Sequence, residues 1–224
     1  DQHPSSLVLV SRTQGTPDFI AYRAADCQLL PHHFPDNLLA EVAIFHTTCF
    51  ALSREPARSS LLGAAVRARA LGVRVSLDAN YAPSIWPDRH EARQVVASYA
   101  SEALIKLSDD DAARLFGRPV SEQEVLDFFF GHGADLVCYT LGAAGSVVAW
   151  DQGQQRIHWA VEPVEVKDAT GAGDAYWSGF LTALLDGLPS HDCAKAGGRM
   201  AAQKLRTMGP LPPAVDKSIL YDRP

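Results

Sequence analysis

The sequence predicts an α/β protein whose mostly parallel β-sheet is covered by helices on both faces. The first observation is that, from about residue 41 onward, apolar runs with strand character alternate with helical patterns. The second is that short connectors join these segments, as expected where helices cross between parallel strands. The third is composition, because 47% of the 224 residues are apolar and 21% are charged. That balance is typical of one globular domain with a sizeable core.

The first segment of the chain differs from the rest. Two runs rich in strand-forming residues, 7–11 and 19–24, flank the turn-rich connector TQGTPD, and this pattern predicts a β-hairpin. The sequence therefore predicts two parts, a hairpin over residues 5–25 and an α/β core over residues 26–224.

The core is expected to begin with a strand (42–52) and a helix (55–72). In that helix Leu61, Ala65 and Ala68 share one apolar face, and Gly72 ends it. The further predicted strands are 73–80, 103–108, two strands around a glycine-rich bend within 135–150, and 156–168. The further predicted helices are 87–100, 109–117, 121–133, one that begins within 171–174, and 191–209.

Two of these helices carry local signals for where they begin. Pro87 suits the first turn of helix 87–100. Ser121 and Glu124 have the spacing of a capping box at the start of helix 121–133.

Charge and hydropathy exclude several classes of function. The net charge of −6 and the lack of a basic cluster argue against a nucleic-acid partner. No apolar run approaches the ~20 residues that span a bilayer, and the first residues do not resemble a signal peptide. Four cysteines, Cys27, Cys49, Cys138 and Cys193, form no CxxC pair, which favours reduced thiols and a cytoplasmic protein.

Polar residues lie at the carboxyl ends of the predicted strands, the edge where open parallel sheets bind ligands. They are Asp78, Asn80, Lys106, Ser108, Thr140 and Asp168. Each of them could equally be a turn former or a helix cap.

The stretch 168–174 is more specific. Gly171 and Gly173 allow backbone angles and close approaches that a side chain would block, and the helix that follows offers unpaired N–H groups to an anion. Asp174 lies in its first turn, either as an acid that stabilises the helix dipole or as a base beside a phosphoryl group. The apolar positions of this helix, at offsets 0, 3, 4 and 7, anchor it to the core: Trp177, Phe180, Leu181 and Leu184.

Four segments carry a family resemblance. DATGAGDAYWSGF resembles the C-terminal signature of the ribokinase-like (PfkB) carbohydrate kinases, with Tyr176 where Phe is usual. SLDANYAPSIW, IKLSDDDAARLFG and TLGAAGSVV are similar to three further segments of the family, in the same order. The segments SREPARSSLLGAAVRARALGVRVSLDAN and ALIKLSDDD look most like the corresponding segments of bacterial fructokinases. The resemblance implies a ribokinase-like three-layer α/β/α fold, with 5–25 as a partial lid hairpin and 26–224 as the C-terminal two-thirds of the domain.

The resemblance also implies a mechanism. Asp174 would take the proton from a sugar hydroxyl as it attacks the γ-phosphate of ATP, while the backbone N–H groups of Gly171, Ala172 and Gly173 form an anion hole. The resemblance implies a nucleotide site made of Lys106, Ser108, Thr140, Gly142, Gly145 and Gly197.

Cation and substrate positions follow from the same resemblance. Asp111, where Glu is usual, would hold a water of an ATP-bound Mg²⁺. A monovalent cation such as K⁺ is implied near Asp168 and Thr170, and Asp78 and Asn80 are candidates for contact with the substrate. A homodimer through the lid is a further expectation.

The sequence leaves several alternatives to a fructokinase-like function to be weighed. Ala82 stands where most sugar-kinase relatives have Arg, which disfavours a sugar-acid substrate such as 2-keto-3-deoxygluconate. A nucleoside kinase is another member of the family to consider, and a non-catalytic nucleotide-binding remnant belongs to a different class. A dinucleotide-binding enzyme is disfavoured, because neither glycine cluster makes G-x-G-x-x-G after a first strand.

Overall fold

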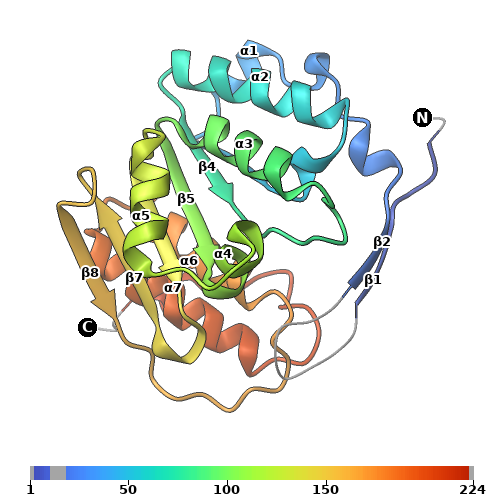
Figure 1. The fold of residues 1–224 in the computed structure, drawn as a ribbon. Coiled ribbons are helices and arrows are strands. Elements are labelled where there is room, and N and C mark those ends of the chain that lie inside the picture. The colour runs from blue at the N-terminus through green and yellow to red at the C-terminus, as the bar shows by residue number, and fades with distance from the viewer. Residues whose placement is uncertain (1–2, 11–18, 222–224) are drawn as a thin grey trace. The chain divides into compact units, whose positions relative to one another are not determined.

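A computed structural model describes residues 3–10 and 19–221 of the chain (Figure 1). It contains a two-stranded sheet, β1-β2, and a six-stranded sheet in the order β3-β4-β5-β6-β7-β8. The chain divides into two compact units. The first comprises 1–8, 21–139 and 149–156, and the second comprises 9–20, 140–148 and 157–224. The division into a lid hairpin and a core stays a prediction.

The strands are β1 Leu7–Val10, β2 Phe19–Tyr22, β3 Ile44–Thr48, β4 Arg74–Asp78, β5 Ala103–Ser108, β6 Leu136–Thr140, β7 Ser146–Trp150 and β8 Gln155–Trp159. The α-helices are α1 Asp36–Ala40, α2 Ala57–Ala70, α3 Arg89–Ala100, α4 Asp109–Phe116, α5 Glu122–Gly131, α6 Ala172–Leu185 and α7 Ser190–Leu205. Short 3₁₀ helices lie at Ala25–Cys27, Pro31–His33, Ala51–Ser53, Gly142–Ala144 and Lys217–Leu220.

Parallel pairing forms the first half of the large sheet. Strand β4 pairs in parallel with β3 on one side and with β5 on the other. Consecutive residues of β4 and β5 are buried, as expected for parallel strands that are covered on both faces. Strands β6 and β7 are neighbours joined by only five residues, which allows an antiparallel pair but no crossover.

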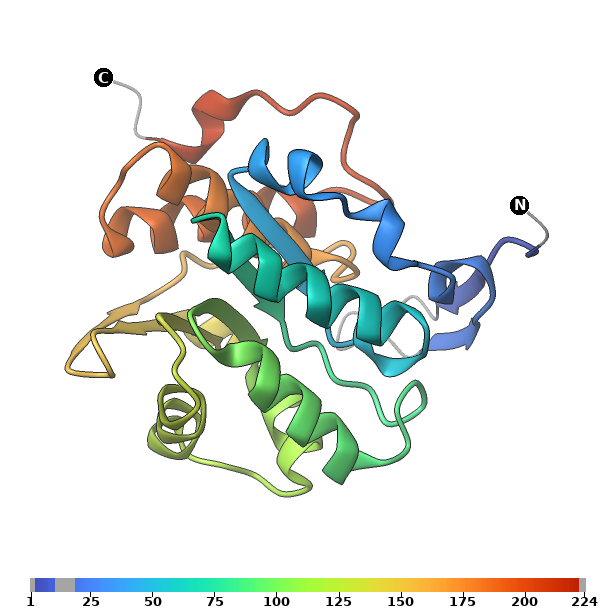
Figure 2. The same cartoon turned by 90° about the horizontal axis from the view of Figure 1, so that it is seen from above.

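Helices α2 and α3 lie side by side in both views (Figure 2). Arg69 of α2 donates a hydrogen bond of 2.7 Å to the carbonyl oxygen of Tyr99 in α3. Near the other end, Arg58 of α2 forms an ion pair of 2.6 Å with Glu91 of α3. The predicted apolar face of α2 is confirmed, because Leu61, Ala65 and Ala68 are all buried.

The start of α3 differs from the prediction. Asp88 is its N-cap and accepts a hydrogen bond of 3.0 Å from the backbone N–H of Glu91. Pro87 therefore lies before the cap rather than in the first turn, because an aspartate satisfies a free helical N–H better than proline does. The capping box of Ser121 and Glu124 at the start of α5 is confirmed.

The predicted strand 156–168 is too long. Strand β8 ends at Trp159, and residues 160–168 have no regular structure. The backbone N–H groups of Lys167 and Asp168 donate instead to the carbonyl oxygen of Leu205 at the end of α7, at 2.8 and 3.3 Å. This segment is therefore held by a helix end and not by a strand ladder, so the expectation that Asp168 directly follows a strand is wrong.

Small residues let α6 and α7 pack closely. A Cβ atom on Gly197 of α7 would lie 2.8 Å from the carbonyl oxygen of Tyr176 in α6, and one on Gly179 of α6 would lie 2.8 Å from the carbonyl oxygen of Ala196. The apolar face of α6 is buried at Trp177 and Phe180, whose rings stack with centroids 4.9 Å apart.

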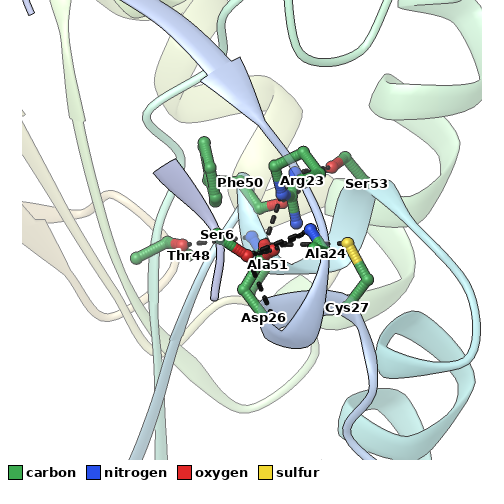
Figure 3. A network of polar contacts seen from close by, with 9 residues as sticks. All are labelled: Ser6, Arg23, Ala24, Asp26, Cys27, Thr48, Phe50, Ala51 and Ser53. Atoms are coloured by element: carbon green, nitrogen blue, oxygen red, sulfur yellow. Dashed lines mark hydrogen bonds and ion pairs between the residues drawn. The ribbon is translucent and has the colours of Figure 1, made fainter. Parts of the chain in front are cut away.

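A polar network joins the two chain segments that flank the hairpin strands (Figure 3). The hydroxyl of Ser6 donates to the carboxylate of Asp26 and accepts from the backbone N–H of Ala24 at 3.0 Å. Arg23 pairs with Asp26 and also donates to Ser53 Oγ at 2.8 Å. The predicted connector of the hairpin, 13–18, lies outside the described residues.

All four cysteines are buried free thiols, in agreement with the prediction. Among the described residues, no helix is both long and apolar enough to pass through a bilayer.

Candidate functional site

The N-terminus of α6 is the most distinctive feature of the predicted site. Gly171 is its N-cap and has a left-handed φ of 78°, which favours glycine. The N–H of Ala172 donates to the carbonyl oxygen of Ala169 at 3.1 Å, whereas those of Gly171 and Gly173 have no acceptor among the described residues. Two of the three N–H groups expected in the anion hole are therefore available to a ligand.

Asp174 lies in the first turn of α6 and is exposed. Its carboxylate makes no hydrogen bond or ion pair with the described part of the chain, and its Oδ2 lies 3.7 Å from the position of a Cβ on Gly171. The carboxylate and the bend of the loop are thus close together. Such a group is free to accept a proton from a bound hydroxyl.

Asp168 organises the loop before α6. Its Oδ1 accepts the backbone N–H of Thr170 at 3.0 Å, and its Oδ2 accepts the backbone N–H of Gly209 at 3.1 Å. These bonds, with the ammonium of Lys204 3.4 Å from Oδ2, hold the pKa of the Asp168 carboxyl well below its usual range. Asp168 is therefore a charged anchor for the loop, and its side chain is only 6% exposed.

The bend between β6 and β7 is the second predicted part of the nucleotide site in the same unit. Leu141 donates its N–H to the carbonyl oxygen of Gly145 at 2.8 Å, which closes a tight turn directly after Thr140. Gly142 and Gly145 both have positive φ, and a Cβ on Gly145 would lie 1.9 Å from the carbonyl oxygen of Trp159. Gly145 is thus required by the turn itself.

In the other unit, the ends of β4 and β5 bring two candidates together. The parallel register places Asp78 opposite Lys106, and the Lys106 ammonium lies 2.9 and 3.1 Å from the two carboxylate oxygens. Both residues are buried, Asp78 with 2% and Lys106 with 4% of its surface exposed, so each neutralises the other. The Oδ1 atom of Asn80, just beyond, is buried without a hydrogen-bond partner.

Asp111 and Ser108 form a capping box at the start of α4. The Ser108 hydroxyl donates to Asp111 Oδ2 at 2.6 Å and accepts from the Asp111 N–H at 3.0 Å. Burial raises the pKa of the Asp111 carboxyl, against the opposing effects of the Lys106 charge and the Ser108 hydrogen bonds. Burial, with the nearby charges of Asp111 and Asp78, also raises the pKa of the Cys49 thiol to about 12.

The candidates therefore form two groups, one in each unit. Gly171–Asp174, Asp168, Thr170 and the Thr140–Gly145 turn belong to one, and Asp78, Asn80, Lys106, Ser108 and Asp111 to the other. Gly197 instead packs beneath Tyr176. Among the described residues, no three His, Cys, Asp or Glu side chains gather in a way that could hold a metal ion.

Sequence reasoning missed Lys204, whose ammonium contacts Asp168 across 36 positions of the chain. A lysine in the last turn of a helix is a common surface residue, so its pattern gives no sign of burial. It also missed the buried hydrogen bond of 2.7 Å between the hydroxyls of Ser146 and Tyr176, although Tyr176 stands out where phenylalanine is usual.

Fold and site together define an α/β protein in which a helix N-terminus with two unbonded N–H groups lies beside an exposed carboxylate. The model of the pfkB family carbohydrate kinases matches residues 1–217, and the chain belongs to that family.

Curated relatives agree with this assignment. The chain is 35% identical over 208 residues to an ATP-dependent 6-phosphofructokinase of Thermoanaerobacterium thermosaccharolyticum, covering 92% of this chain and 64% of that protein. It is 30% identical over 199 residues to a fructokinase of Salmonella typhimurium, covering 85% of this chain and 62% of that protein. The chain thus spans a little under two thirds of the length of these relatives.

Solved structures confirm the predicted ribokinase-like α/β fold class. Fructokinase from Vibrio cholerae O395, in its fructose, ADP and calcium ion bound form, matches with a TM-score of 0.80 and 26% identity. The match covers 93% of this chain and 70% of that one. Adenosine kinase from Sinorhizobium meliloti matches in fold with a TM-score of 0.83 at 24% identity, covering 96% of this chain and 65% of that one.

Proposed function

We propose that this protein transfers the γ-phosphoryl group of ATP to a hydroxyl of a fructose-type sugar. The observation that carries the proposal is the start of α6, where two unbonded N–H groups, of Gly171 and Gly173, lie in the same turn as the free carboxylate of Asp174. Phosphoryl transfer depends mainly on positioning and on stabilising charge on the phosphoryl oxygens, and a helix N-terminus supplies such stabilisation.

In this proposal Asp174 accepts the proton of the attacking hydroxyl. The N–H groups of Gly171 and Gly173 donate to the transferred phosphoryl group, and Ala172 joins them when its bond to Ala169 opens. The positive end of the α6 dipole stabilises negative charge on the phosphoryl oxygens. Asp111 is the residue that would hold a water of an ATP-bound Mg²⁺, and that ion would supply charge neutralisation on the phosphates.

The remaining predicted nucleotide contacts belong to the same proposal. Lys106 and Ser108 lie at the carboxyl end of β5, and Thr140 is the last residue of β6, directly before the turn that contains Gly142 and Gly145. Gly197 serves the nucleotide site through the close packing of α6 and α7, which it permits.

The acceptor has two main candidates. Relatives named fructokinase favour a neutral sugar, and the relative named ATP-dependent 6-phosphofructokinase favours a sugar phosphate. Asn80, with its buried unpartnered oxygen, and Asp78 beside it are the residues we assign to the substrate side. 2-Keto-3-deoxygluconate and nucleosides are less favoured acceptors, and a non-catalytic nucleotide-binding role is the competing function.

A coupled assay of ADP release tests the function. Full-length gene product is supplied with ATP, Mg²⁺ and one acceptor at a time: fructose, fructose 6-phosphate, 2-keto-3-deoxygluconate or adenosine. We expect turnover with fructose or its 6-phosphate. ATP binding without turnover on any acceptor would support the non-catalytic role.

Asp174→Asn tests the assigned base. Because this carboxylate makes no hydrogen bond or ion pair with the described residues, the substitution is expected to lower kcat by ~10²–10⁴. The melting temperature should fall by at most about 4 °C, because the variant loses only the interaction of one exposed acid with the helix dipole. Asp192→Asn, at an exposed acid in the first turn of α7, is the matched control. A loss of kcat below tenfold would remove Asp174 from the base role.

We also infer that the hairpin strands pair with a second copy of the chain, because their apolar side chains are exposed. We also propose a cytoplasmic location, which agrees with the four free thiols.

A further inference from the structure

The ammonium of Lys204 lies among three oxygen atoms inside the protein. It is 3.4 Å from the carbonyl oxygen of Asp168, 3.4 Å from that of Thr207 and 3.4 Å from Asp168 Oδ2. The side chains of Lys204 and Asp168 are 8% and 6% exposed. A charge with so little exposed surface needs a compensating partner, and here carboxylate and carbonyl oxygens both supply it.

Two carbonyl oxygens and a carboxylate oxygen are also the kind of donors that a monovalent metal cation takes. An ammonium and a potassium ion carry the same charge. They would repel one another if both lay beside Asp168, and the carboxylate already accepts two backbone N–H groups, from Thr170 and Gly209. The residues around Asp168 therefore do not fit an additional cation.

Lys204 is also connected to the loop that precedes α6. Its Cε lies 3.9 Å from the position of a Cβ on Gly171. The Lys204 ammonium also neutralises the carboxylate of Asp168, which accepts the backbone N–H of Thr170, next to Gly171. An internal ammonium thus stabilises the same turn whose N–H groups are open to an anion.

We propose that Lys204 takes the place of a monovalent cation in this protein, so that the loop 168–171 keeps its conformation without K⁺. Only the consequence for catalysis rests on the proposed kinase function. The contact of Lys204 with Asp168 is tested through stability and cation binding, which are independent of turnover.

The experiment compares thermal unfolding in potassium chloride and in tetramethylammonium chloride at equal ionic strength. We expect no potassium-specific stabilisation of the unaltered protein. Lys204→Met leaves the buried carboxylate of Asp168 without a charged partner, so the melting temperature of the variant should fall by about 10 °C in tetramethylammonium and recover in part in potassium. Lys217→Met, at an exposed lysine paired with Asp186 at 2.7 Å, is the control and should respond equally to both salts.

Thallium(I), a probe for K⁺ sites, gives a second measurement by ²⁰⁵Tl NMR. Binding of thallium to the unaltered protein, lost in Asp168→Asn, would overturn the proposal. So would a potassium-specific rise in the melting temperature of the unaltered protein. Both measurements remain informative if Lys204→Met does not fold, and neither depends on kinase activity.

A second inference comes from a separate cavity of about 650 Å³ in the other unit, a size typical of small-ligand sites. Three arginines line it, Arg89, Arg93 and Arg114, together with His90 and one acid, Asp88. The Asp88 carboxylate is used as the N-cap of α3. The wall of this cavity is therefore predominantly basic.

These arginines differ in how they are paired. Arg114 lies 3.5 and 3.6 Å from Asp110 and Asp111, distances that are long for a strong ion pair. Arg93 stacks over the ring of Phe116 at 4.7 Å, and its Nε is buried without a partner. Arg89 forms no hydrogen bond or ion pair within the described ranges 3–10 and 19–221.

The geometry points to a binding site for a small organic phosphate. Guanidinium groups that face one cavity repel each other unless an anion lies between them, and their planar donors match phosphate oxygens. Phe116 and Tyr81 give the same cavity an aromatic surface for the organic part of the ligand.

Calorimetric titration with ribose 5-phosphate and with inorganic phosphate tests this site, with ADP present to fill any nucleotide site. Ribose 5-phosphate should bind more tightly than phosphate, and Arg89→Gln should weaken its binding at least tenfold. Arg118→Gln, at an exposed arginine paired with Glu124, is the control. No binding, or equal binding by the Arg89 variant, would overturn the inference and leave the kinase proposal untouched.

Discussion

Gly145 and Gly142 lie in one turn and have different steric surroundings. Gly145 has φ 96° and would place a Cβ 1.9 Å from the carbonyl oxygen of Trp159, whereas a Cβ on Gly142, at φ 54°, would meet nothing within 4 Å. We expect Gly145→Ala to lower the free energy of unfolding by about 3 kcal/mol, since it adds a clash to backbone strain. Gly142→Ala is the control and should cost about 1 kcal/mol. Equal losses in denaturant titrations would contradict this account.

Asp111 gives a residue-scale prediction for pH. Its pKa is raised in the folded protein, so above the unfolded value of about 3.9 the folded state holds a proton that the unfolded state has lost. Stability contributed by this group therefore falls as pH rises from about 4 through its folded pKa. Depressed carboxyls such as Glu124, whose pKa is lowered to about 2, act in the opposite direction and below pH 4.

The measurement is the free energy of unfolding between pH 4 and pH 7. Asp111→Asn retains a side-chain oxygen for the capping box but removes the ionisation. The variant should therefore gain stability relative to the parent as pH rises. Asp109→Asn, at an exposed acid of the same helix turn, is the control. A difference that stays constant across this range would refute the assignment.

At the scale of elements, Arg23 links the segment directly after β2 to residues 50–53 of the same unit. Its guanidinium pairs with Asp26, donates to Ser53 and stacks 3.9 Å from the centre of the Phe50 ring (Figure 3). Arg23→Met should destabilise the protein by about 2–4 kcal/mol, because it leaves Asp26 without its charged partner.

Hydrogen exchange measures this effect on the hairpin directly. Amides of β1 and β2 should exchange faster in the Arg23 variant, while those of β4 and β5 keep their protection. Arg54→Met, at an exposed arginine nearby, is the control. Uniformly faster exchange in all four strands would mean that Arg23 stabilises the whole fold and not the hairpin.

At the scale of the whole molecule, the hairpin strands carry an unusual amount of exposed apolar surface. Leu7, Leu9, Ile20 and Tyr22 are each more than half exposed, at 54%, 51%, 60% and 59%. We expect the protein to self-associate through these strands, with a sedimentation coefficient that rises with concentration. Ile20→Lys should abolish the rise, and Val66→Lys, at an equally exposed position of α2, should not.

Much of the fold could be predicted because it is local. The strand at 103–108 and the helix at 109–117 match β5 and α4 to within one residue, since period and capping signals lie within a few positions of each other. The predicted strand 156–168 is longer than β8, because apolar alternation continues past Trp159. The backbone N–H groups of Lys167 and Asp168 instead bond to Leu205, 38 and 37 positions away. No local signal reports such a partner.

For the site, the amino-acid sequence alone predicts the run from Asp168 to Asp174, because a glycine turn, a helix start and an acid are adjacent in the chain. It also determined the family through four ordered segments. Folding brings together the charges that are distant in the chain: Lys204 with Asp168, Lys106 with Asp78, and three arginines around one cavity. These distances depend on strand register and helix packing, which join residues that are far apart in the chain.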